Sequence, residues 1–95
     1  MWEIVVTILG EDGSSETITL NLVSQLEFEE LEGVSSIINC FVEGISRRQE
    51  LRLAWLARKQ LGITVPADLK AFAATVKAVK ADLARLPFGD QEPTE

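Results

Sequence analysis

The sequence predicts an α+β fold, in which an N-terminal β-hairpin packs on a small bundle of three to four helices. Two runs predict the hairpin: the apolar, β-branched residues 2–9 and the alternating residues 16–22, joined by a turn segment rich in Gly, Asp and Ser. Segments with apolar residues at helical spacing follow them. The 95 residues have the length of one domain. We therefore expect a single compact domain over residues 1–86, with the hairpin at 2–22.

Two short helices are expected after the hairpin. The first covers about residues 24–32, because Ser24 and Glu27 have the spacing of a capping box and Gly33 can end the helix. The second covers residues 34–45, where Val, Ile and Phe recur at the i, i+3, i+4 spacing of an amphipathic helix. The segment is rich in β-branched residues, which also fit a strand, and the helix is the preferred interpretation.

A third helix is expected at residues 47–61. Ser46 and Gln49 repeat the capping-box spacing before it, and Gly62 stands where a left-handed terminal residue is common. This segment, RRQELRLAWLARKQLG, is basic at both ends and apolar in its middle. Its apolar arc is wider than one contact with a small core requires.

A fourth helix is expected at residues 66–86. Pro66 suits a first helical position, and apolar residues from Leu69 to Leu86 follow on one stripe, with the lysines largely off it. The helix is expected to end before Pro87, and residues 87–95 are expected to form an acidic flexible tail.

Composition argues against enzymatic chemistry. Histidine is absent and Cys40 is the single cysteine, so the usual general base and the Ser/His and Cys/His nucleophile pairs are missing. No cysteine-based metal site is possible, and no phosphate-binding glycine loop is present. The sequence therefore predicts no catalytic residue, no metal site and no cofactor. No apolar run approaches the roughly 18–20 residues of a membrane span, so no membrane contact is expected.

Charge is divided unevenly along the chain. Residues 1–45 contain nine acidic and no basic residues, whereas residues 46–86 contain all nine basic residues and three acidic ones. This asymmetry predicts either ion pairs between the two halves or head-to-tail association between copies. A basic nucleic-acid surface is the weaker interpretation, because the acidic residues would repel a phosphate backbone and aromatic residues do not interleave with the basic ones.

Five apolar residues in the basic half are candidates for contacts with a partner protein or a second copy. Trp55 lies at the centre of the third helix and could be an aromatic anchor, or a core residue whose indole N–H reaches a carbonyl. The same choice between interface and core is open for all five. The candidates are Leu51, Trp55, Leu56, Phe72 and Val76.

The order of these parts resembles the small tail assembly chaperones of long-tailed bacteriophages, especially phages of actinobacteria. The most similar pieces are EFEELEG, residues 27–33, and LAWLARKQLG, residues 53–62. The resemblance implies a protein of the host cytoplasm that is not an enzyme. It would bind the long, helical tape-measure protein and keep it soluble while the tail tube polymerises. In this family a longer form made by frameshifting is common.

Two rival functions come from other classes. A small adaptor or antitoxin-like protein would bind and neutralise a partner protein, and a toxin gene beside its own would favour that interpretation. A nucleic-acid-binding module would be retained on DNA or RNA columns, with retention falling steeply as salt rises.

Overall fold

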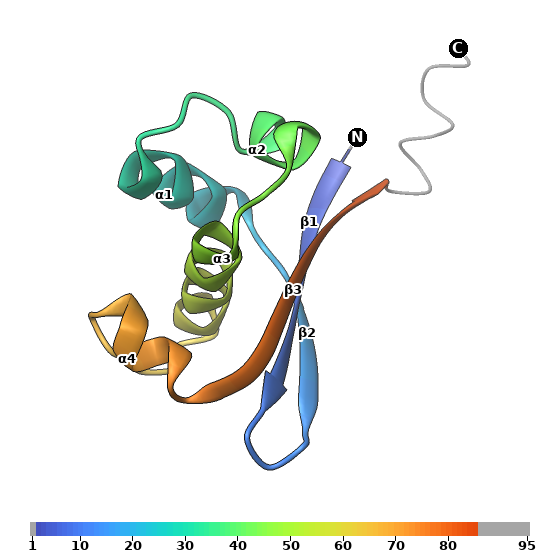
Figure 1. Cartoon of the computed structure of the whole chain (residues 1–95). Helices are drawn as coiled ribbons and strands as arrows, with labels where there is room; N and C mark the ends of the chain where they lie inside the picture. Colours follow the sequence, from blue (N-terminus) through green and yellow to red (C-terminus); the bar gives the residue numbers. More distant parts are fainter. Residues whose placement is uncertain (1, 86–95) are drawn as a thin grey trace.

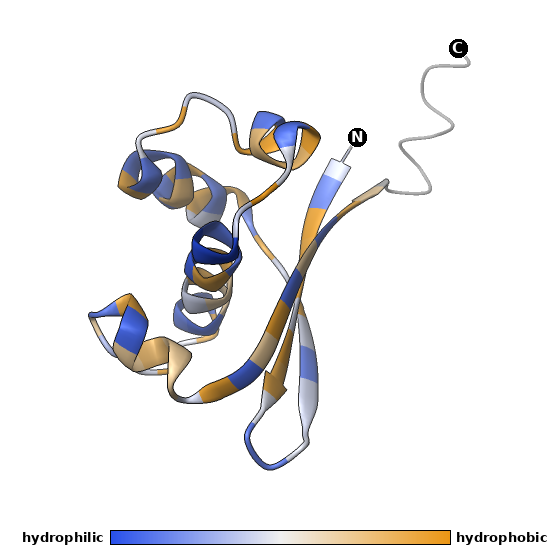
Figure 2. Cartoon of the chain, in the orientation of Figure 1, coloured by the Kyte–Doolittle hydropathy of each residue, from blue (hydrophilic) through white to orange (hydrophobic). Residues whose placement is uncertain are grey.

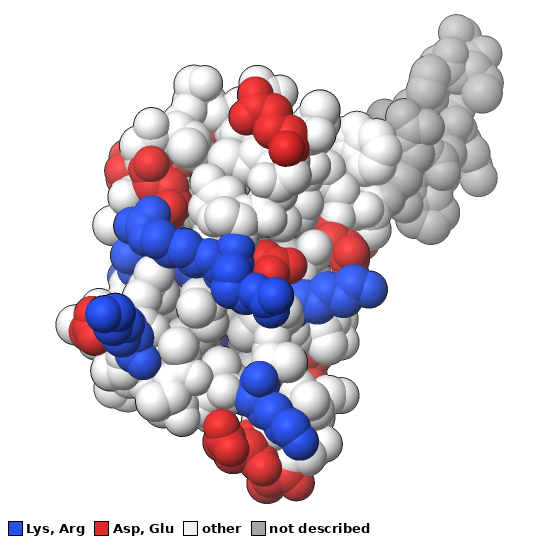
Figure 3. All heavy atoms as spheres, in the orientation of Figure 1, with Lys and Arg blue, Asp and Glu red and all other residues white. Residues whose placement is uncertain are grey.

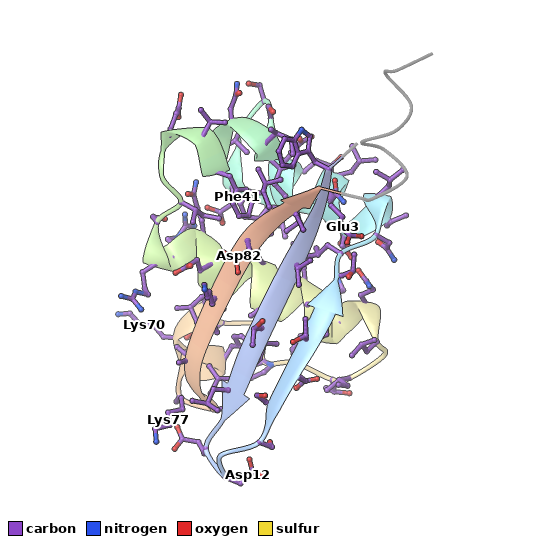
Figure 4. The ribbon with its side chains drawn as sticks, turned by 90° about the vertical axis from the view of Figure 1, so that its right-hand side faces the viewer. Glu3, Asp12, Phe41, Lys70, Lys77 and Asp82 are labelled. Carbon is purple, nitrogen blue, oxygen red and sulfur yellow. The ribbon has the colours of Figure 1, made fainter. Side chains whose placement is uncertain are left out.

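The computed structural model describes residues 2–85, and it has the α+β architecture predicted from the sequence. Three antiparallel strands form a sheet with the order β2-β1-β3. All helices lie on one side of this sheet, as Figure 1 shows. No helix within residues 2–85 covers the other face of the sheet (Figure 4). The fold thus has two layers around one apolar core.

The predicted hairpin is confirmed, but its second strand ends at Thr19 and not at Leu22, because Asn21 caps α1 and Leu22 is the first residue of that helix. Strand β1 covers Trp2–Gly10 and pairs with β2, Ser15–Thr19, so that Val6 lies opposite Ile18. Alternate β1 residues face the helices and are fully buried, namely Ile4, Val6 and Ile8. This alternation is the period of two that predicted the strand.

The helices differ from their predicted bounds mainly at their ends. Helix α1 covers Leu22–Glu32 and begins earlier than predicted, because Asn21 and not Ser24 is its N-cap: the Asn21 side chain accepts from the Ser24 amide at 2.8 Å. Gly33 ends it with a positive φ of 66°, as predicted. Helix α2 is shorter than predicted and covers Ile37–Glu43, after the cap residue Ser36.

Helix α3 covers Arg47–Gln60, close to the predicted range. Its predicted capping box is confirmed, since Ser46 accepts from the Gln49 amide while the Gln49 side chain accepts from the Ser46 amide. Gly62 follows its end with a φ of 83°, and its amide donates to Lys59 at 3.0 Å. The helix therefore has a well-defined beginning and end.

The long helix predicted at residues 66–86 is wrong. The structure has a short helix, α4, at Leu69–Ala73, and then a ten-residue strand, β3, at Val76–Arg85. Pro66 lies in the preceding loop, and Asp68 is the N-cap of α4. Residue 86 and the predicted tail at 87–95 lie outside the described residues.

A physical reason for this error is visible in the pairing of β3. It runs antiparallel to β1, with Val6 opposite Ala81 and Ile8 opposite Val79. The spacing of Val79 and Leu83 fits one face of a helix and also one face of a strand. As a strand, the segment supplies hydrogen-bond partners to the side of β1 that β2 does not reach. The hydrogen bonds gained by pairing with β1 outweigh the helix preference of this alanine-rich segment.

The core lies between the sheet and α3. The sheet contributes Ile4, Val6, Ile8 and Ile18, and α3 contributes four buried residues, which are Leu53, Ala54, Leu56 and Ala57. Figure 2 shows that apolar residues recur along β1 and β3. None of the helices in the described range is both long and apolar enough to cross a bilayer.

Candidate partner-binding surface

The acidic and basic halves of the chain are joined by ion pairs within the fold. Among the described residues, Arg48 and Arg52 both bind the carboxylate of Glu32, at 2.7 and 3.4 Å. Arg58 pairs with Glu16 at 2.7 Å, and Lys59 with Glu27 at 3.2 Å. Part of the charge asymmetry is therefore satisfied internally, by three of the nine acidic residues of the first half, which is the first of the two outcomes predicted for it.

Two carboxylates of α1, those of Glu32 and Glu29, make contacts that hold the fold together. Only 1% of the Glu32 side chain is exposed, and its two arginines neutralise it. Glu29 accepts from the amide of Ile37 at 2.8 Å and so caps the start of α2. Within residues 2–85, no group of three His, Cys, Asp or Glu side chains is arranged to hold a metal ion.

Cys40 is buried on α2 and has the environment of an unreactive thiol. Burial raises the pKa of Cys40, and the nearby carboxylates of Glu43, Glu32 and Glu29 raise it further. Gln49 approaches its sulfur at 3.8 Å. A raised pKa keeps the thiol protonated, and a protonated thiol is a poor nucleophile.

Trp55 fastens the loop between α3 and α4. Its indole N–H donates to the carbonyl of Pro66 at 2.6 Å, which is the contact expected if this residue is structural. The cationic groups of Arg52 and Lys59 lie 4.9 and 5.1 Å from the ring centroid. Trp55 is half-buried and packs against the core. This tryptophan therefore positions the chain that leads into α4.

Helix α4 is fixed by one residue of its own and by its cap. Phe72 is 1% exposed and inserts into the core, and Asp68 accepts from the amide of Ala71 at 3.2 Å. Thr75 then donates to the Phe72 carbonyl at 2.6 Å and closes the turn into β3. A five-residue helix does not form alone, so these contacts decide where its other side chains lie.

An apolar groove lies between α3 and α4. It has a volume of about 340 Å³, at the small end of ligand-binding clefts, and it is open to solvent. Its floor and walls are mainly apolar, and Arg48 and Lys70 bring cations to it. The residues that line it are Arg48, Leu51, Leu69, Lys70 and Ala73. In Figure 3 basic side chains form a row across the face shown, with acidic groups above and below it.

The five predicted contact residues are separated by the structure. Leu51 lines the groove, and Trp55 lies half-buried beside the α3–α4 loop. Leu56, Phe72 and Val76 are core residues, with exposed fractions of 1%, 1% and 7%. A partner cannot reach these three from outside this fold, so only Leu51 and the edge of Trp55 stay candidates.

Two other surface features were not predicted from the sequence: the groove residues of α4 and an exposed face of α1. Leu69 and Lys70 join Leu51 in the groove because the loop between α3 and α4, held by the Trp55–Pro66 hydrogen bond, brings α4 back against α3. In α1 an apolar face is left exposed, formed by Leu22, Val23 and Leu26. A signal for this face exists in the sequence: apolar residues occur on several sides of the helix, and one core contact cannot bury all of them.

No protein family, curated protein or solved structure matches the chain in comparisons of sequence and of fold.

Proposed function

We propose that this chain is a binding protein that holds a helical partner, and that it acts as a phage tail assembly chaperone for the tape-measure protein in the host cytoplasm. The observation that carries the proposal is the apolar groove between α3 and α4, with Leu51 in its lining and cations at Arg48 and Lys70. An amphipathic helix can place an apolar side chain in such a groove while its polar face stays in water.

The shape of the groove suits a client that presents many similar helical stripes. Its contacts are shallow and apolar, and such surfaces discriminate weakly between related segments. A tape-measure protein is long and helical, so it offers a repeated target of this kind. The resemblance of residues 27–33 and 53–62 to tail assembly chaperones supports the same choice of client.

The test is co-expression with the longest helical protein encoded nearby, as the candidate tape-measure protein. A tagged pull-down and size-exclusion chromatography with light scattering would follow. We expect a co-complex that keeps the client soluble, and we expect Leu51→Glu and Lys70→Glu to weaken it by about tenfold or more. The matched control is Leu61→Glu, which changes an exposed leucine outside the groove lining.

Circular dichroism separates loss of binding from loss of folding. Leu51 is partly buried, so its variant must retain the helical signal, whereas Lys70 is exposed and its variant should fold normally. A client that stays insoluble with the wild-type chain would contradict the chaperone role. A complex with a neighbouring toxin-like protein instead would favour the adaptor.

A further inference from the structure

The exposed face of α1 is an apolar ridge without a partner in the described part of the chain. Leu22, Val23 and Leu26 are 74%, 67% and 60% exposed. At 3.6 residues per turn these three side chains lie on one side of the helix, while Ser24 and Phe28 on the other side are buried. Glu30 lies one turn beyond Leu26 on the same side and is exposed.

Charges not used within the fold are opposite on the ridge and in the groove. Among residues 2–85, Glu30 makes no ion pair, and neither does Lys70 at the groove. Arg48 binds Glu32, but 65% of its side chain is still exposed. A convex helix face that carries Leu26 and Glu30 therefore matches an apolar groove that carries Leu51 and Lys70, in both shape and charge.

We propose that the α1 ridge of one copy docks into the α3–α4 groove of a second copy. Leu26 would enter between Leu51 and Leu69, and Glu30 would meet the cations at Arg48 and Lys70. Contacts of ridge with ridge would bring two Glu30 carboxylates together, and contacts of groove with groove would bring the cations together. The charges thus select a head-to-tail contact over both symmetric ones.

A head-to-tail contact leaves one ridge and one groove unused at the ends of every oligomer. Such an arrangement continues to add copies unless the rotation closes a ring. The inference stands without the proposed client, because both surfaces belong to this chain. If the client uses the same groove, the client and the second copy compete for it.

The experiment uses the purified full-length chain and two variants at exposed positions. Leu26→Glu blocks the ridge and keeps the groove, whereas Lys70→Glu blocks the groove and keeps the ridge. We expect the wild type to grow in mass with concentration in sedimentation velocity. We expect each variant alone to associate about tenfold or more weakly.

Mixing the two variants is the decisive measurement. The intact ridge of Lys70→Glu can dock into the intact groove of Leu26→Glu, but neither remaining end can bind again. We therefore expect a 1:1 heterodimer that does not grow further. A mixture that stays monomeric, or a wild type that is monomeric up to about 1 mM, overturns the proposal.

The control variant is Val42→Glu, which places the same charge on an apolar residue of α2 that is 75% exposed. It should associate like the wild type, and an equal loss in this variant would overturn the proposal by showing a general effect of added negative charge. Leu22→Glu serves as a second ridge variant if Leu26→Glu proves unstable, because Leu22 is still more exposed.

Discussion

Helices α1 and α3 lie against each other and differ in the share of their apolar residues that they bury. Helix α3 buries Leu53 and Leu56 and sends its charged residues outward or into ion pairs. Helix α1 buries one apolar residue, Phe28, together with Ser24 and the carboxylate of Glu32, while Leu22 and Leu26 face solvent. The first pattern is that of a helix that stabilises a core. The second is that of a helix held by one core residue, Phe28, and by polar contacts at both ends, with most of its apolar residues left exposed for another molecule.

The contacts between the two helices show how α1 is held. Gln60 of α3 accepts from the amide of Asn21 at 2.9 Å and from the Ser24 hydroxyl at 3.0 Å, and it donates to the Thr19 carbonyl at 2.9 Å. At the other end of α1, Glu32 binds Arg48 and Arg52. Polar groups buried at a helix interface must find partners, and here each end of α1 has them.

The largest expected effect is on the core side of α3. Leu53→Ala should lower the free energy of unfolding by about 2–5 kcal/mol, because Leu53 is fully buried and its removal leaves a cavity. The same change on α1, Leu26→Ala, should alter it by no more than about 0.5 kcal/mol. Urea denaturation followed by circular dichroism, at a concentration where the chain is monomeric, measures both. Equal losses would show that Leu26 is buried and that the contrast between the helices is false.

A smaller effect is expected from the polar contacts of α1. Glu32→Gln should cost about 2 kcal/mol, because Arg52 is largely buried and loses its charged partner, whereas the exposed end of Arg48 is screened by water. Glu30→Gln is the matched control and should be neutral. The measurement is again urea denaturation, and a neutral Glu32→Gln would mean that α1 is held by its apolar residues.

The contrast between the helices explains what the sequence could predict. Helix α3 was predictable because its cap residues Ser46, Gln49 and Gly62 are local signals and its apolar pattern has a core to face. The start of α1 was misplaced because Asn21 and Ser24 are both good caps, and the choice between them depends on Gln60, far along the chain. Capping signals in the local sequence do not fix the start of a helix when a side chain far along the chain selects between two caps.

The groove between α3 and α4 could be predicted only in part from the sequence. Leu51 could be selected because it lies on the wide apolar arc of α3. Leu69 and Lys70 could not be placed beside it, since their position depends on the bond between Trp55 and Pro66 and on β3 pairing with β1. The apolar spacing of residues 69–85 also fits one continuous helix, so the sequence alone does not reveal these contacts. The groove is therefore a product of tertiary structure.

A third prediction concerns the other polar attachment of α1. Gln60→Ala should cost about 1 kcal/mol, because its three hydrogen bonds lie at a partly exposed site where water can replace them. Hydrogen exchange should show the loss locally, as faster exchange of the amides at the start of α1 than at its end. Uniformly faster exchange along α1 would contradict a local role for Gln60.

The smallest expected effect is a dependence of the folding stability on pH, which is caused by Cys40 and is sensitive to the buried carboxylate of Glu32. Burial, together with the carboxylates of Glu43, Glu32 and Glu29, raises the pKa of Cys40 in the fold above its value in the unfolded chain. The unfolded thiol therefore ionises first. Stability should be unaffected below about pH 8 and should fall as the pH rises through roughly 8.5, until the folded thiol also ionises.

This dependence should vanish in Cys40→Ala and should be reduced in Glu32→Gln, where one of the nearby negative charges is gone. Urea denaturation between about pH 7 and 10 measures all three proteins, with the variants corrected for their lower stability at neutral pH. An unchanged slope in Glu32→Gln would mean that burial and the carboxylates of Glu43 and Glu29 raise the pKa of Cys40 without a contribution from Glu32. Arg48 and Arg52 would then neutralise the Glu32 carboxylate so completely that its charge does not affect the pKa of Cys40.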